Sequence, residues 1–287
     1  MQYGAHMYLW IDRWSDDQLG LLDRARELGL GYVEIAVGDD VEFAPGLTRE
    51  RAEALGLDLL VSPGGLWPVE CDISSPDPED RRRGLAWHRA ALDLAADLGA
   101  AAYAGAIYGH PGVVRTDRRP EECYARTAEG LAELADHADA RGVQLVVEPM
   151  SRFRTHIANT PAQIMRLVRM AGHPNLGVAL DTYHAVTEVR DYGEAVRACG
   201  DRLWVVHPCE NDRGVPGGGL VQWDALFSAL AEVGFDGRIG LESYNTSLGD
   251  FALRRGIFGD VCPDGDAFVR QALAFLMPVA QRAYGSP

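Results

Sequence analysis

Short apolar runs alternate with longer amphipathic segments from one end of the chain to the other. The short runs predict strands at residues 3–9, 31–37, 57–62, 101–107, 143–149, 176–181, 203–208 and 238–243. The amphipathic segments predict helices at residues 16–28, 49–55, 79–98, 121–140, 161–170, 193–199, 223–233 and 266–284. The pattern is therefore that of an α/β protein in which every strand is followed by a helix.

The number and spacing of these units indicate a barrel. Eight strand–helix units in 287 residues repeat at about 36 residues, which is typical of a (β/α)8 TIM barrel. Glycine ends several of the helices just before the next strand, as at Gly29 and Gly99, where it suits the left-handed C-cap. A doubly wound open sheet is the alternative, but its phosphate-loop fingerprint after the first strand is missing. We expect residues 1–287 to form one TIM barrel domain.

The balance of charge excludes several classes of function. The chain has 27 basic and 42 acidic residues, a net charge of −15, and every basic residue is an arginine. Such an acidic surface repels phosphate backbones, so we expect no nucleic-acid partner. Without lysine, the chain cannot be a Schiff-base aldolase, a pyridoxal-phosphate enzyme or a P-loop NTPase.

Cysteine usage and hydropathy suit a cytoplasmic protein. The five cysteines are widely spaced, odd in number and form no CxxC pair, so we expect reduced thiols rather than a disulfide framework. The first residues lack the features of a signal peptide. No window approaches 18 uninterrupted apolar residues, so we expect no membrane partner.

Four consecutive predicted strands end in a polar side chain. These residues are Glu148, Asp181, His207 and Glu242, and a barrel brings the carboxyl ends of its strands to one rim. Three carboxylates so close would repel one another unless a cation lay between them. Three oxygen donors with one imidazole suit a divalent ion such as Mn²⁺, with Mg²⁺ or Co²⁺ as alternatives, better than zinc.

Several motifs then resemble those of one enzyme family. They are Val147-Glu148-Pro149-Met150-Ser151-Arg152-Phe153, Leu180-Asp181-Thr182-Tyr183-His184, His207-Pro208-Cys209-Glu210-Asn211-Asp212-Arg213, Pro216-Gly217-Gly218-Gly219 with Trp223-Asp224, and Leu241-Glu242-Ser243. Together they resemble the D-tagatose 3-epimerase (ketose 3-epimerase) family of the xylose-isomerase-like TIM barrels. The similarity extends over most of the chain.

The resemblance implies a role for each of these residues. Glu148, Asp181, His207 and Glu242 would hold the metal, and Glu148 and Glu242 would also be the catalytic acid and base. His184 and Arg213 match family positions that hydrogen-bond substrate oxygens. His6, near the end of the first strand, would face the same rim as a substrate-binding residue. Family likeness also suggests a homo-oligomer, either a dimer or a tetramer.

One position departs from the family. Ketose 3-epimerases commonly carry a glutamate where this chain has Arg154, a change of two charge units close to the substrate. Arg154 could bind an acidic, phosphorylated or bulkier substrate, or it could pair with a nearby acid and never meet the substrate.

The leading interpretation is a metal-dependent isomerase that inverts C3 of a ketose or keto-sugar derivative, by proton transfer between two glutamates through an enediolate. The alternative is another enolate reaction at the same site, either aldose–ketose isomerisation or elimination by a keto-sugar or keto-inositol lyase. An endonuclease IV-like repair enzyme would need more histidines and a basic face. A non-catalytic sugar sensor would lack one of the two glutamates.

Overall fold

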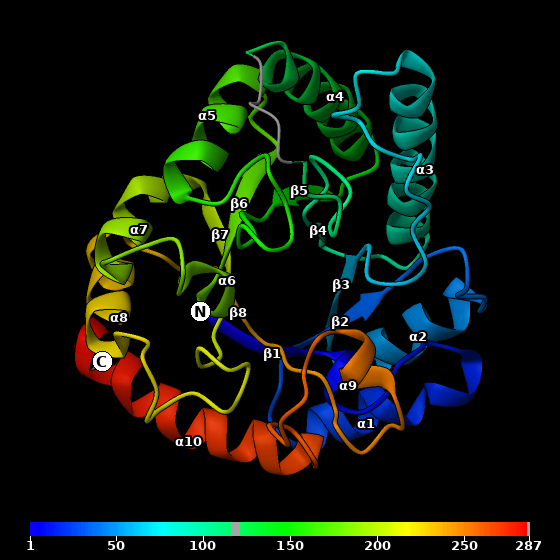
Figure 1. Ribbon diagram of the computed structural model, residues 1–287. Helices are drawn as coiled ribbons and strands as arrows, with labels where there is room; N and C mark the ends of the chain where they lie inside the picture. The colour runs from blue at the N-terminus through cyan, green and yellow to red at the C-terminus, as the bar shows by residue number, and fades with distance from the viewer. Residues whose placement is uncertain (116–120, 286–287) are drawn as a thin grey trace.

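Eight parallel strands close into a barrel in the computed structural model, which describes residues 1–115 and 121–285. The strands follow one another around the barrel in chain order, and β1 pairs with β8 (Figure 1). Their bounds are β1 Gln2–His6, β2 Tyr32–Ala36, β3 Asp58–Ser62, β4 Ala102–Gly105, β5 Gln144–Val147, β6 Leu176–Asp181, β7 Leu203–His207 and β8 Arg238–Leu241. The predicted (β/α)8 TIM barrel is confirmed.

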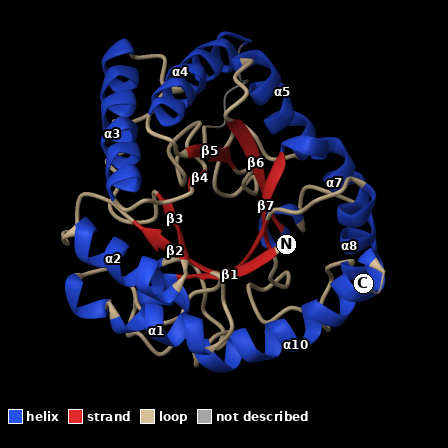
Figure 2. Ribbon diagram, turned by 180° about the vertical axis from the view of Figure 1, so that it is seen from behind, coloured by secondary structure: helices blue, strands red, loops and turns tan. Residues whose placement is uncertain are grey.

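Helices surround the barrel as an outer ring (Figure 2). They are α1 Gly20–Glu27, α2 Pro45–Leu55, α3 Pro78–Asp97, α4 Glu121–Ala140, α5 Pro161–Ala171, α7 Tyr192–Cys199, α8 Trp223–Glu232 and α10 Gly265–Tyr284. Each matches a predicted helix, and the glycines expected at C-caps do adopt positive φ, as at Gly29 (84°) and Gly99 (67°). Within the described ranges, no helix is both long and apolar enough to cross a membrane.

Most boundaries differ from prediction by one to three residues, and three differences are larger or have a visible local cause. The first strand ends at His6, because the His6 side chain accepts a hydrogen bond from the Tyr8 backbone N–H and starts the 3₁₀ helix η1, Met7–Leu9. Helix α2 begins at Pro45, where a proline fits the first helical turn. A separate 3₁₀ helix, η2 (Asp16–Gln18), precedes α1.

Two short helices were not predicted. They are α6, Thr182–Ala185, and α9, Phe251–Arg254. Each is four residues long, too short for a helical period to be visible in the sequence. Both lie in loops that follow strands, inside the outer ring of helices (Figure 1).

Small apolar side chains and one tyrosine fill the barrel interior. This buried layer consists of Tyr32, Leu60, Ala102, Ala104, Val146, Ala179 and Val205. Gly4 and Gly240 make room for the Tyr32 ring, since a Cβ at Gly4 would lie 2.3 Å from a ring carbon and one at Gly240 would lie 2.6 Å from the hydroxyl. Because strand side chains alternate, the residues two positions further on also point into the barrel, one layer nearer the carboxyl ends.

Candidate active site

A polar layer lies directly above the apolar layer of the barrel. Counting two residues on from the interior positions leads to Glu34 after Tyr32, Ser62 after Leu60, Glu148 after Val146, Asp181 after Ala179 and His207 after Val205. His6 and Glu242 follow the interior glycines of β1 and β8 in the same way. The alternation of strands therefore brings together the four predicted ligands and His6, all of them buried.

The four predicted ligands, together with His184, fall into two groups that overlap at Asp181. Ligand atoms of Asp181, His207 and Glu242 lie within 4.8 Å of one another, and so do those of Glu148, Asp181 and His184. Asp181 belongs to both groups. The two groups are therefore adjacent, and a single metal site that uses all four predicted ligands stays a prediction.

Glu34 orients the imidazole of His207. The Nε2 atom of His207 lies 3.2 Å from Oε2 of Glu34, and its Nδ1 lies 3.2 Å from Oε2 of Glu242. Burial lowers the pKa of His207, but the carboxylates of Glu34 and Glu242 outweigh it and raise that pKa well above the ordinary value. Nδ1 thus faces the Glu242 carboxylate and the other predicted ligands.

His6 extends this network toward β3. Its Nε2 lies 3.1 Å from the Ser62 hydroxyl and 3.9 Å from Oε1 of Glu34. Burial, the largest effect, lowers the pKa of His6 in spite of Glu34. His6 is therefore neutral and can donate or accept a hydrogen bond on the β1 side of the site without adding a positive charge.

Arg213, in the loop after β7, bridges two of the carboxylates. Its guanidinium forms ion pairs with Asp181 and, at 2.5 Å, with Glu242. The side chain is 1% exposed, and its backbone has φ 72°, a left-handed conformation that costs energy for a residue with a long side chain. The Ser243 hydroxyl, which donates to the Arg213 carbonyl at 2.7 Å, helps to hold this turn.

These contacts give the two glutamates opposite electrostatic environments. Burial raises the pKa of Glu148 well above its ordinary value, and the charge of Asp181 adds to that effect. Burial also acts on Glu242, but Arg213 and His207 outweigh it and hold its pKa well below the ordinary value. Oε1 of Glu148 is buried without a hydrogen-bond partner in the described chain. Of the two glutamates, Glu242 therefore has an ion pair with Arg213, whereas Glu148 forms no ion pair with any described residue.

The donor set fits a divalent cation. A buried oxygen of Glu148 has no hydrogen-bond partner among the described residues. Ligand atoms of Asp181 lie within 4.8 Å of those of Glu148, and also of those of His207 and Glu242. Buried anionic groups of this kind are stabilised by metal coordination. Oxygen donors with one imidazole favour a hard or borderline ion.

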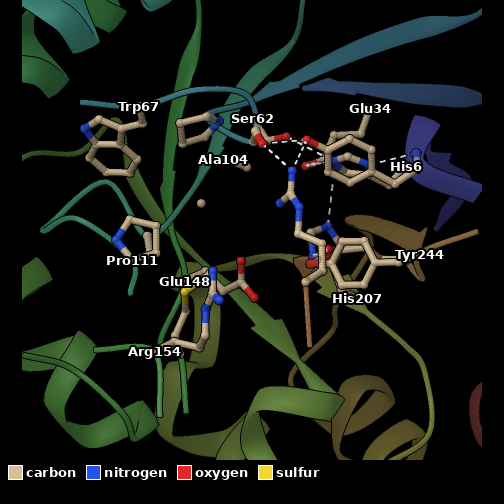
Figure 3. Close-up of a pocket in the computed structure, with 18 residues that line it drawn as sticks. His6, Glu34, Ser62, Trp67, Ala104, Pro111, Glu148, Arg154, His207 and Tyr244 are labelled. Carbon is tan, nitrogen blue, oxygen red and sulfur yellow. Dashed lines mark hydrogen bonds and ion pairs between the residues drawn. The ribbon is translucent and has the colours of Figure 1, made fainter. Parts of the chain in front are cut away.

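A pocket that is partly open to solvent lies over this group. Its lining includes His6, Glu34, Glu148, Arg154, His207 and Glu242, and Figure 3 shows Arg154 beside Glu148 with Tyr244 across from them. His184 and Arg213 are buried against Asp181 instead. Their contacts with substrate stay a prediction.

Sequence reasoning did not select Glu34, Tyr244 or Arg255, which are among the residues that line this pocket. Glu34 does not end its apolar run, and so it escaped a search for polar strand termini; an acidic residue inside a buried parallel strand is the signal that could have found it. Tyr244 and Arg255 lie beyond β8 in a loop. No periodic pattern marks loop residues, and nothing in the sequence distinguished them.

Comparison with known proteins agrees with this geometry. The sequence profile of the xylose isomerase-like TIM barrel family matches residues 22–277. An L-ribulose 3-epimerase of Mesorhizobium japonicum is 30% identical over 276 residues, covering 95% of this chain and 92% of that protein. A D-psicose 3-epimerase of Agrobacterium fabrum is 29% identical, covering 96% and 98%.

The solved structures that are similar to this chain also include 3-epimerases. An L-ribulose 3-epimerase superposes with a TM-score of 0.90 at 29% identity, covering 98% of this chain and 95% of that one. A D-psicose 3-epimerase from Clostridium cellulolyticum H10, solved with D-tagatose, superposes with a TM-score of 0.87 at 26% identity, covering 98% and 99%.

The chain belongs to the xylose isomerase-like TIM barrel family. Within that family its relatives are ketose 3-epimerases, as the resemblance implied. Ketose 3-epimerases are isomerases, so the protein is an enzyme of that class.

Proposed function

We propose that the protein inverts C3 of a ketose or keto-sugar derivative, with Glu148 and Glu242 as the two proton-transferring groups. The relatives support sugar C3 epimerase activity and a small-molecule sugar as substrate. The observation that carries the proposal is the pocket, which is lined by carboxyl groups from two separate strand ends, Glu148 and Glu242. A reaction that removes a proton from one face of a carbon and returns one to the other needs two such groups.

The reaction conserves atoms and electrons. One carboxylate takes the proton from C3, and the electron pair of that C–H bond moves into the C2–C3 bond to form an enediolate. The other carboxyl group then gives a proton to the opposite face of C3, which restores the ketone with inverted configuration. Each glutamate ends in the protonation state in which the other began, so the reverse reaction uses the same groups with their roles exchanged.

We assign the metal to Glu148, Asp181, His207 and Glu242. A divalent ion held there supplies Lewis-acid polarisation of the substrate's carbonyl and hydroxyl oxygens, which acidifies the C3–H bond. Glu34 holds His207 so that Nδ1 faces this volume. We propose Mn²⁺, with Mg²⁺ or Co²⁺ as alternatives, because all three accept mixed oxygen and imidazole ligands.

The remaining assignments complete the proposal. His184 and Arg213 would hydrogen-bond substrate oxygens, and His6 would do so from the β1 side of the pocket. We propose a cytoplasmic enzyme, since its five cysteines are odd in number, widely spaced and form no CxxC pair, and reduced thiols suit that compartment. We also propose a dimer or tetramer, with no nucleic-acid or membrane partner.

Hydrogen exchange at C3 tests the function. Metal-loaded protein is incubated in D₂O with a panel of ketoses and keto-sugar derivatives, and deuterium is followed by NMR. The proposal expects deuterium at C3 together with the C3 epimer. Accumulation of an aldose would instead identify an isomerase, and loss of water from the sugar would identify a lyase.

Substitution of the glutamates adds a second test. Glu148→Gln and Glu242→Gln keep the size of the side chain but cannot take a proton. We expect each to lower turnover by at least about 10²–10⁴-fold, without rescue by excess Mn²⁺. If saturating Mn²⁺ returned either variant to near wild-type rates, that residue would be a ligand only and the two-base mechanism would fail.

A further inference from the structure

Arg255 presents an unpaired positive charge to the active-site pocket. It follows α9 in the loop after β8 and lines the pocket beside Tyr8 and Tyr244. One nitrogen, Nη2, donates to the Tyr8 hydroxyl at 2.9 Å and to the Gly64 carbonyl at 2.7 Å. The guanidinium carbon lies 4.7 Å from the centre of the Tyr8 ring. These contacts fix the plane of the group, but within the described ranges no carboxylate forms an ion pair with it.

Arg154 presents a second such charge from the loop between β5 and α5. Its backbone is tied down, since its N–H donates to the Ser151 carbonyl at 2.8 Å and its carbonyl accepts from Gly112 at 2.6 Å. Its side chain lines the pocket beside Glu148 (Figure 3) and forms no ion pair with any described residue. By contrast Arg152, two positions earlier, pairs with Glu188 outside the pocket. The sequence left open whether Arg154 pairs with an acid, and among residues 1–115 and 121–285 no acid forms an ion pair with it.

The two guanidinium groups face a common space. The guanidinium carbon of Arg255 lies 5.6 Å from the centre of the Tyr244 ring. Arg154, Arg255 and Tyr244 all line the same pocket. The space between them is part of the pocket that holds Glu148 and Glu242.

A neutral sugar would not explain two unpaired guanidinium groups in a partly enclosed pocket. Taking a charged group out of water is unfavourable unless an opposite charge meets it. Arginine is the side chain best suited to bind phosphate or carboxylate, through paired hydrogen bonds. We propose that the substrate is a keto sugar with an anionic substituent, a phosphate or a carboxylate, which Arg154 and Arg255 bind. This inference rests on the proposed function, because it concerns the same pocket.

The test compares neutral and anionic substrates. C3 exchange is measured with the metal-loaded enzyme on a free ketohexose, on its 1- and 6-phosphate esters and on a keto sugar acid. We expect kcat/KM at least tenfold higher for one anionic class than for the neutral sugar. A preference for the esters identifies phosphate as the group bound, and a preference for the acid identifies carboxylate.

Variants assign that preference to the two arginines. Arg154→Gln and Arg255→Gln should each reduce the ratio of anionic to neutral kcat/KM at least tenfold, and Arg154→Glu should invert it toward free ketohexoses. Arg255→Lys, which keeps the charge, should retain most of the ratio and controls for lost packing. Arg169→Gln, at an exposed arginine on α5, should leave the ratio unchanged.

The possible results distinguish a failure of the anionic-substrate inference from a failure of the proposed epimerase function. Equal exchange on neutral and anionic sugars, with an unchanged ratio in Arg154→Gln, overturns the anionic substrate and leaves the epimerase standing. If no sugar exchanges hydrogen at C3, the proposed epimerase function is wrong. The anionic-substrate inference is then tested by binding alone. Calorimetric titration with the phosphate esters and the keto acid should then show affinity at least tenfold weaker in Arg154→Gln than in wild type, and equal affinities would overturn it.

Discussion

Glu34 offers the sharpest test of how the metal group is built. It contacts His207 Nε2 at 3.2 Å, and it is 2% exposed, whereas His207 is 3% exposed. Glu34→Gln keeps an oxygen that can accept this hydrogen bond but removes the charge. Glu34→Ala removes both. Neither change alters a predicted ligand, and the contact of Glu34 with His207 is its direct link to the predicted metal group.

The size of the effect follows from the two roles of the carboxylate. It fixes the orientation of the ring and makes Nδ1 a stronger donor, and losing such support costs about 10- to 100-fold in metal affinity. That is roughly 1.4–2.7 kcal/mol. Glu34→Ala should also leave the Nε2 donor buried without an acceptor, which costs a further 1–3 kcal/mol or so of folding stability.

Titration of metal-free protein with Mn²⁺ measures the first effect, and urea unfolding measures the second. We expect Glu34→Gln to bind Mn²⁺ about 10- to 100-fold more weakly and to regain turnover at high Mn²⁺ concentration. Glu42→Gln, at an exposed loop position, controls for the loss of one negative charge. Mn²⁺ affinity within threefold of wild type in Glu34→Gln would refute the orienting role of Glu34.

The remaining predictions concern the metal and acid stability. Chelation should abolish activity and lower the melting temperature, by roughly 5–10 °C when compared with a metal concentration of about 100 Kd; full activity after chelation would contradict the metal site. Asp181→Asn should weaken Mn²⁺ affinity and be partly rescued by excess Mn²⁺, and failure of any rescue would give Asp181 a role beyond ligation. Burial lowers the pKa of His88 to about 3. Because the unfolded chain binds this proton from about pH 6.5 downward, stability should fall by up to about 1.4 kcal/mol per pH unit between about pH 6.5 and 3. His88→Gln should flatten that dependence in urea unfolding, and an unchanged slope would refute it.

The fold and the metal group were predictable because both depend on periodicity. The lengths of the strands and the spacing of the helices predicted eight strand–helix units. The rule that a polar residue ends an apolar run identified Glu148, Asp181, His207 and Glu242 as candidates. Glu34 obeys the same alternation, two residues beyond Tyr32. It was missed because Ile35, Ala36 and Val37 continue the apolar run after it, and a rule that reads only the last residue of a run passes over it.

The residues that face the substrate from the loops were not predictable in the same way. Arg154 and Arg255 are about a hundred positions apart, and no alternation or helical spacing assigns either side chain a direction. Their presence in one pocket depends on the course of the β5–α5 and β8–α10 loops, on the four-residue helix α9 and on the stacking of Arg255 over Tyr8. In a TIM barrel the strand ends supply reacting groups, while the loops shape the rest of the pocket. The metal and proton-transfer groups that we propose come from strand ends, whereas the two guanidinium groups that we propose to bind an anionic substituent come from loops. The charge of the substrate can therefore change in such a barrel without any change at the strand ends.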